Sequence, residues 1–218
     1  MYLTNTRPDM CFAVNTLSQY LVQPRQVHLV AAKHVMRYLK GTIDFGLYYD
    51  GIHEYRLYGY TDVDWARSIL DRKITSSGCY SLGSAMISWF SRKQSYVSLR
   101  TAEAIYIEAC SNSCESIWLQ KLMLGLFNLE LDTTMILCDN QICIKMTENP
   151  VFHDRSKHIE IRYFYIRDMM KKGAIKLRYV SIDEQVVDVL TKPLSRVKFE
   201  HFREKLGVVW KYLPRKGG

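Results

Sequence analysis

The sequence lacks the features that mark membrane-spanning, secreted and fibrous proteins. No apolar run approaches the roughly 20 residues that a membrane-spanning helix needs. The first seven residues, MYLTNTR, lack the basic-then-apolar plan of a signal peptide. We find no internal repeat and no low-complexity tract in the sequence. We therefore expect an intracellular protein.

Zinc-binding cysteine patterns are absent as well. The chain has six cysteines, but none of them forms a CxxC pair and none lies near a pair of histidines at zinc-ligand spacing. A reducing compartment keeps such scattered cysteines as thiols, which pack like small apolar side chains. We expect buried thiols at Cys11, Cys79, Cys110, Cys114, Cys138 and Cys143.

The composition is that of an ordinary soluble domain with excess positive charge. Its 218 residues are 48% hydrophobic and 24% charged, which is enough for one domain or for one domain with an appendage. The formal net charge is +8 and the pI is about 9.1. A basic protein favours an anionic partner, and nucleic acid is the leading candidate.

The first 50 residues predict a helical hairpin. Apolar residues recur at helical spacing over 10–21, and again over 27–39 between Pro24 and Gly41. Two helices alone cannot enclose a core. The hairpin should therefore pack on the rest of this chain or on a partner domain.

The remainder of the chain predicts a mixed sheet with helices. We expect the first three strands to be antiparallel neighbours, with Gly83-Ser84 as the turn between the second and the third. The expected strands are 55–61, 78–82, 86–90, 134–138 and 175–180, and the expected helices are 102–126, 140–146, 158–172, 185–190 and 196–206. This order predicts an α/β fold with a five-stranded mixed sheet flanked by helices, preceded by the N-terminal helical hairpin.

Four acidic residues stand inside or beside apolar runs, where a carboxylate is costly to desolvate. They are Asp62, Glu103, Asp139 and Asp188. In the expected elements they fall at strand ends, at a helix start and in a late helix, which can converge at one edge of a sheet. A converging set of carboxylates suits hard divalent metal ions.

Each of these acids also has an ordinary interpretation. Glu103 can simply favour a helix N-terminus, and Asp139 can cap the helix that follows its strand. Asp64 competes with Asp62 for the first position. Asp183 and Glu184 compete with Asp188 for the last one.

Long motifs surround these acids. They read GYTDVDWA at 59–66, DRK at 71–73, ISW at 87–89, KQS at 93–95, TAEA at 101–104, CDNQ at 138–141, NPVFH at 149–153, KHI at 157–159 and LTKPL at 190–194. Together they resemble the ribonuclease H domain of copia-type LTR retrotransposon Pol polyproteins, over about 55–207. Residues 2–9 and 37–42 resemble the segment that follows the polymerase palm in the same polyproteins.

The resemblance implies a fold, a reaction and a set of domains. It implies a ribonuclease H-like domain at 55–209, preceded at 1–50 by a thumb- or connection-like remnant of reverse transcriptase and followed at 210–218 by a flexible tail. It also implies that Asp62, Glu103, Asp139 and Asp188 hold two Mg²⁺ ions, or Mn²⁺, for hydrolysis of the RNA strand in RNA·DNA hybrids.

The resemblance also implies partners and a location. The reverse transcriptase would lie upstream in the same polyprotein, with no membrane partner. The location would be the cytoplasm, in a virus-like particle, or the nucleus. A polymerase site is not expected within this chain, since it contains no Tyr-x-Asp-Asp motif.

Several positions depart from the family pattern. Arg67 replaces a Gly, Arg100 replaces a small residue and Ile105 replaces a Glu, while the loop at 181–184 carries no His. Arginines near a metal site compete with the metal for the carboxylates. The alternative function is therefore a catalytically degenerate remnant that acts only as a nucleic-acid-binding or structural module.

Basic residues provide the predicted contacts to nucleic acid. They concentrate between residues 155 and 178 and comprise Arg155, Lys157, Arg162, Arg167, Lys171, Lys172, Lys176 and Arg178. Such a cluster suits phosphate contacts with little sequence preference, and the alternative is a solvated helix face. Asn140 and Gln141 are candidates for recognising a 2′-hydroxyl, unless Asn140 only caps its helix.

Overall fold

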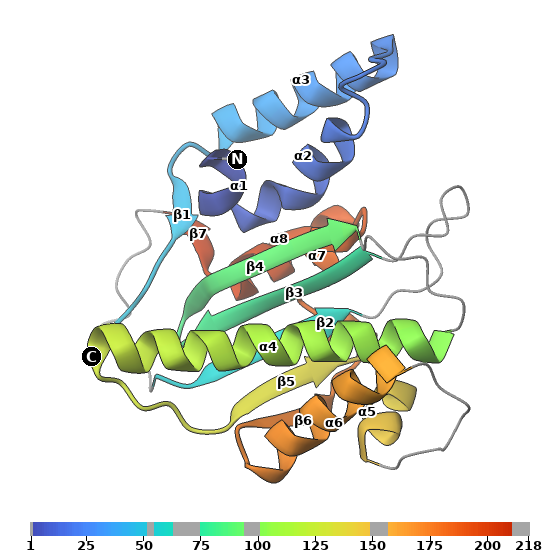
Figure 1. Ribbon diagram of the computed structural model, residues 1–218. Helices are drawn as coiled ribbons and strands as arrows, with labels where there is room; N and C mark the ends of the chain where they lie inside the picture. Colours follow the sequence, from blue (N-terminus) through green and yellow to red (C-terminus); the bar gives the residue numbers. More distant parts are fainter. Residues whose placement is uncertain (1, 52–54, 63–74, 94–100, 149–156, 211–218) are drawn as a thin grey trace.

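A five-stranded mixed sheet forms the centre of the protein. The computed structural model describes residues 2–51, 55–62, 75–93, 101–148 and 157–210. The strand order is β4-β3-β2-β5-β6, in which β2 pairs antiparallel with β3 and parallel with β5 (Figure 1). The strands are β2 (Leu57–Asp62), β3 (Thr75–Leu82), β4 (Ala85–Lys93), β5 (Thr134–Cys138) and β6 (Ile175–Tyr179). The predicted α/β fold class is confirmed.

Helices cover both faces of this sheet. Successive residues of a strand point to opposite faces, and Cys79 and Tyr80 show this on β3. The Tyr80 hydroxyl donates to the carbonyl of Asn112 at 2.7 Å on the long helix α4. Cys79 faces the other side, where it joins a buried cluster with Val187 and Phe202. Figure 1 shows α4 in front of the sheet and α7 and α8 behind it.

The larger helices agree with the expected ranges. The helices are α1 (Tyr2–Thr6), α2 (Cys11–Ser18), α3 (Gln26–Gly41), α4 (Thr101–Phe127), α5 (Gln141–Glu148), α6 (Lys157–Lys171), α7 (Asp188–Thr191) and α8 (Arg196–Lys205), with short 3-10 turns η1 (Pro8–Met10) and η2 (Ile182–Glu184). α1 was not expected. The helix expected at 185–190 begins later, because Gln185 is held in a buried turn by a side-chain hydrogen bond to Thr61.

A second, two-stranded sheet was also not expected. β1 (Phe45–Leu47) pairs antiparallel with β7 (Val208–Trp210), so the end of the N-terminal segment meets the end of α8. Strands of three residues are too short to show a period-2 pattern. Gly207 links α8 to β7 with a φ of 82°, a backbone conformation that favours glycine.

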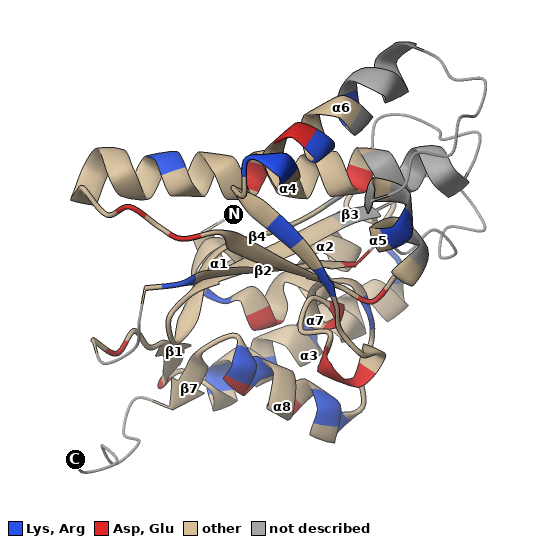
Figure 2. Cartoon of the chain, turned by 90° about the horizontal axis from the view of Figure 1, so that it is seen from below, with Lys and Arg blue, Asp and Glu red and all other residues tan. Residues whose placement is uncertain are grey.

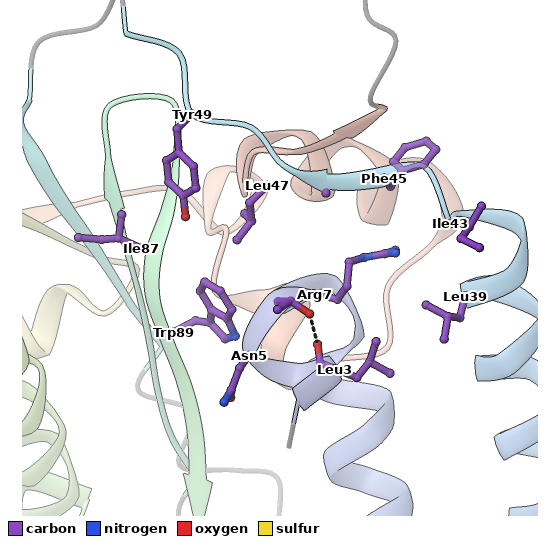
Figure 3. A pocket seen from close by; sticks show the side chains of 12 residues that line it. Leu3, Asn5, Arg7, Leu39, Ile43, Phe45, Leu47, Tyr49, Ile87 and Trp89 are labelled. Carbon is purple, nitrogen blue, oxygen red and sulfur yellow. Dashed lines mark hydrogen bonds between the residues drawn. The ribbon is translucent and has the colours of Figure 1, made fainter.

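The N-terminal helices pack on the rest of this chain, which is the first of the two arrangements expected for the hairpin. Cys11 belongs to the same buried cluster as Val187 and Phe202. The Trp89 indole of β4 donates to the carbonyl of Thr4 at 2.7 Å. A cavity of about 590 Å³ remains between the N-terminal helices, β1 and β4, and Trp89 and Leu47 are among its lining residues (Figure 3).

A buried ion pair holds the N-terminal helices together. The Arg7 guanidinium donates to both carboxylate oxygens of Asp9, at 2.9 and 2.8 Å, and these residues are only 6% and 4% exposed. Arg7 also donates to the carbonyl and the hydroxyl of Thr42, both at 2.9 Å. The Tyr38 hydroxyl donates to Asp9 at 2.7 Å. The turn before α2 and the end of α3 therefore share one charged network.

The cysteines only partly follow the expected burial. Cys11, Cys79, Cys138 and Cys143 are buried thiols, whereas Cys110 is half-buried and Cys114 is exposed. Both exceptions lie on α4, and the Cys114 position faces solvent. The expectation that all six thiols are buried is thus wrong for these two. Among the described residues, no helix is both long and apolar enough to cross a membrane.

Candidate acidic site at the sheet edge

Two of the predicted acids follow neighbouring parallel strands. In the register of β2 and β5, Thr61 pairs with Cys138. Asp62 is the next residue after Thr61 and Asp139 is the next after Cys138. Neighbouring strands lie about 4.8 Å apart. The two acids therefore lie side by side at the edge of the sheet formed by the C-terminal ends of β2 and β5.

A third predicted acid reaches this edge from α7. Asp188 is the first residue of α7 and is 3% exposed. The turn before it is fixed to β2, because the Gln185 side-chain amide donates to the carbonyl of Thr61 at 2.9 Å. Val187 and Leu190 anchor the same turn in the apolar cluster behind the sheet. The position of Asp188 therefore follows from packing on both sides of it.

Asp62 and Asp188 meet at one ammonium group. Lys192 Nζ lies 3.1 Å from Asp62 Oδ2 and 2.8 Å from Asp188 Oδ1. The Thr191 hydroxyl also donates to Asp62 Oδ2, at 3.1 Å. The two carboxylates are almost fully buried, with side chains 3% and 4% exposed. Burial of charge at this level requires a partner, and Lys192 provides one to both acids.

Asp139 lies at the margin of this group and is half-buried. Burial raises the pKa of Asp139 above the ordinary aspartate value, and the nearby charge of Asp188 acts in the same direction. Lys192 and a hydrogen bond with Gln185 oppose the increase. The ionised form of Asp139 is therefore disfavoured in the folded protein as it stands.

The remaining acids fall in different places. Glu103 lies in the first turn of α4, but its side chain is outside the described residues. Asp64, the alternative to Asp62, is also outside them. Asp183 is 94% exposed at its side chain and pairs with Lys198 at 3.3 Å, and Glu184 is exposed. Of the three late candidates, only Asp188 shares a cation with Asp62.

Three residues at this site were not predicted as functional: Gln185, Thr191 and Lys192. The signal for Lys192 was present, because it stands four residues after Asp188, and such pairs face each other on one helix side. Gln185 could not have been found in this way, since its contact with Thr61 spans 124 positions of the chain.

A further buried acid, Glu108, lies on the other face of the sheet. Glu108 of α4 is fully buried and accepts from the backbone amide of Ser77 and the side-chain amide of Asn112, both at 3.0 Å. It approaches Thr61, whose hydroxyl lies 3.5 Å away. Glu108 therefore joins α4 to the ends of β2 and β3, on the side opposite to Asp62.

The donor atoms suit a hard divalent cation. Carboxylate oxygens are the ligands that Mg²⁺ and Mn²⁺ prefer, and Asp62 and Asp188 already converge on one positive charge. Within the described ranges, however, no three His, Cys, Asp or Glu side chains are grouped closely enough to hold a metal ion. The acids fit such an ion in chemical type, and in this conformation Lys192 lies between two of them.

The predicted nucleic-acid contacts are spread over α5, α6 and β6. The Asn140 side-chain oxygen accepts from the amide of Cys143 at 3.1 Å, so Asn140 caps α5, as its ordinary interpretation required. Gln141 is exposed beside it. Arg155 and the side chain of Lys157 are outside the described residues.

The basic side chains in and just after α6 differ in their exposure to solvent. Arg162 is half-buried, whereas Lys171 and Lys172 are exposed. Lys172 pairs with Asp168 at 2.7 Å, which reduces its availability for a phosphate. Figure 2 shows basic residues on α8 as well as on α6, so positive charge is not confined to the predicted region.

The chain resembles known proteins in its sequence. No protein-family model matches it. It is 41% identical over 217 residues to the retrovirus-related Pol polyprotein from transposon RE2 of Arabidopsis thaliana, a match that covers 100% of this chain and 15% of that protein. It is 38% identical over 205 residues to that from transposon TNT 1-94 of Nicotiana tabacum, covering 93% of this chain and 15% of the relative. The chain thus spans about a seventh of the length of these relatives.

Solved structures give a weaker likeness. An N-terminal RNase H domain from Mycobacterium tuberculosis, solved as a fusion with maltose-binding protein, is 9% identical. That match covers 69% of this chain and 98% of that chain with a TM-score of 0.46. At this score the structural likeness is partial. The family of the chain is therefore assigned from its sequence relatives.

Proposed function

Because the chain belongs to the family of Pol polyproteins from copia-type retrotransposons, we propose that it is the ribonuclease H of such a polyprotein. It would hydrolyse the RNA strand of RNA·DNA hybrids, using divalent metal ions. The upstream reverse transcriptase would act in the same polyprotein and supply the hybrid.

One observation carries this proposal. Asp62, Asp139 and Asp188 come from three separate elements, yet all three lie at the edge where β2 and β5 end. Asp62 and Asp188 are almost fully buried there and Asp139 is half-buried, so each of them loses hydration. The free energy lost on desolvating these carboxylates is consistent with a site at which their negative charge serves to bind a cation.

The residues have distinct roles in the proposed reaction. Asp62, Glu103, Asp139 and Asp188 would hold Mg²⁺, which stabilises the charge of the phosphodiester and lowers the pKa of the attacking water. Thr191 orients Asp62 through the hydrogen bond at 3.1 Å. Gln185 fixes the turn that presents Asp188. Exposed cations on α6 and β6 would contact the hybrid through its phosphates.

The proposal is tested by cleavage of a labelled RNA·DNA hybrid with Mg²⁺ or Mn²⁺. We expect the parent chain to cut the RNA strand, and we expect Asp62→Asn and Asp188→Asn each to reduce the rate at least 100-fold, about 2.7 kcal/mol in the activation barrier. The matched control is Asp183→Asn, which changes an exposed acid five positions from Asp188. Equal rates for the parent and the Asp62 and Asp188 variants would refute the assigned site.

Lys192 also favours the alternative function, a module that binds without cutting. An ammonium shared by Asp62 and Asp188 lets the folded chain keep its buried acids with no metal ion. The net charge of +8 would still support binding to nucleic acid. A parent chain that binds the hybrid but leaves its RNA intact under both metals would establish this alternative.

A further inference from the structure

The main chain of Lys192 is held in place by its neighbours. Its backbone amide donates to the carbonyl of Asp188 at 2.8 Å, which ends α7. Its backbone is extended, with φ −128° and ψ 145°, and Pro193 follows it. A proline restricts the preceding residue to this extended region. The main chain of Lys192 is therefore fixed, and only its side chain can change place.

The lysine side chain is the least enclosed member of the buried group. It is 14% exposed, compared with 3% for Asp62 and 4% for Asp188. A lysine head group lies on a flexible four-carbon stem, so it can move toward solvent while the two carboxylates stay in place. The structure thus places a cation on a flexible stem beside two more deeply buried carboxylates.

We propose that Lys192 is a built-in counter-cation of the acidic site, which a divalent metal ion must displace in order to bind. This inference rests on the proposed function insofar as the metal is the one that the nuclease would use. Asp62 Oδ2 and Asp188 Oδ1 already contact the ammonium at 3.1 and 2.8 Å. A metal ion on the same oxygens would meet a like charge at close range, which is strongly unfavourable at a site with little water.

Two consequences follow for the protein. Without metal, Lys192 stabilises the fold by neutralising acids that would otherwise repel each other. With metal, it lowers the affinity, because part of the binding free energy is used to move the ammonium away. Lys192 would therefore set the metal concentration at which the site fills.

The test is metal binding by the full chain and by Lys192→Met, which keeps most of the side-chain length and removes the charge. In calorimetric titrations with Mg²⁺ and with Ca²⁺, without nucleic acid, we expect the variant to bind at least 10-fold more tightly than the parent. In chelator its melting temperature should be lower than that of the parent, and saturating metal should restore most of the difference. Lys198→Met is the matched control, since Lys198 pairs with an exposed acid, and its metal affinity should equal that of the parent.

Equal or weaker metal binding by Lys192→Met would overturn the inference, and so would a lack of metal binding by both chains. If the variant does not fold, the parent chain alone gives the answer through acetylation of its lysines, measured by mass spectrometry. Saturating metal should increase labelling of Lys192 relative to Lys198, and an unchanged ratio would overturn the inference. Failure here is separable from failure of the nuclease proposal, because hybrid cleavage by the parent and by Asp62→Asn is measured independently.

Discussion

Replacing Asp9 by Asn should greatly lower the melting temperature of the protein. The substitution keeps the size of the side chain and one hydrogen-bond acceptor, but it removes the charge opposite Arg7. The Arg7 side chain is 7% exposed, and its guanidinium donates two hydrogen bonds, at 2.9 and 2.8 Å, to the Asp9 carboxylate. In Asp9→Asn this cation stays buried without an anion.

The magnitude follows from the burial of the pair. Breaking a buried ion pair by removing one partner costs about 3–5 kcal/mol, whereas an exposed pair contributes about 0.2–1 kcal/mol. For a chain of this length, 1 kcal/mol shifts the melting temperature by about 2–4 °C, so we expect a decrease of about 6–20 °C. The double variant Arg7→Met with Asp9→Asn should recover part of the loss, because no unpaired charge remains.

The assay is thermal and urea unfolding of the full chain, followed by circular dichroism. Asp168→Asn is the matched control: its pair with Lys172 has almost the same length, 2.7 Å, but the two side chains are 51% and 62% exposed. We expect that variant to change the free energy of unfolding by less than about 1 kcal/mol. If Asp9→Asn and Asp168→Asn cost the same, burial does not give the Arg7 pair its strength and the reasoning fails.

Three further predictions concern single positions. Gly207→Ala should destabilise the protein by at least about 2 kcal/mol, because φ is 82° and an added Cβ would lie 2.6 Å from the Cα of Ala85. Gly125→Ala, which meets nothing within 4 Å, should instead stabilise α4 by up to about 1 kcal/mol; urea unfolding measures both, and equal effects would contradict the account. The pKa of Asp139 is raised by burial, so the parent chain loses stability as the pH rises through that pKa. Without metal, Asp139→Asn should therefore raise the melting temperature at pH 8 and have little effect on it at pH 3. A change in melting temperature that is the same at both pH values would refute this. A hydrogen bond with Cys110, with help from Tyr165 and Arg162, lowers the pKa of Cys114 to about 6, so iodoacetamide at pH 7 should alkylate Cys114 before the other thiols, as mass spectrometry would show.

The sequence was most informative where one periodic pattern ran long enough to be read. The helix expected at 102–126 is α4 at Thr101–Phe127, and the strand expected at 134–138 is β5 at the same residues. Gly41 and Gly173 mark the ends of helices as expected, and Gly173 has a φ of 69°. In these segments local pattern and tertiary packing favour the same structure.

The sequence was least informative where a structure depends on contacts between distant segments. The pairing of β1 with β7 joins residues more than 150 positions apart, and neither strand has a pattern of its own. At the acidic site, residue types and strand ends predicted that acids would gather at one edge. They did not predict that Lys192 would pair with two of them, since the place of its main chain is set by the packing of α7 into the core.

The pairing of β1 with β7 makes the boundary between the two segments expected from the sequence a poor place to divide this protein. The helical segment shares the Cys11 cluster, the Trp89 hydrogen bond and the β1–β7 sheet with the remainder of the chain. A protease that cleaves between residues 47 and 57 would therefore leave two pieces that remain associated and elute as one species. The contacts of the folded protein therefore extend across the boundary that the sequence predicted.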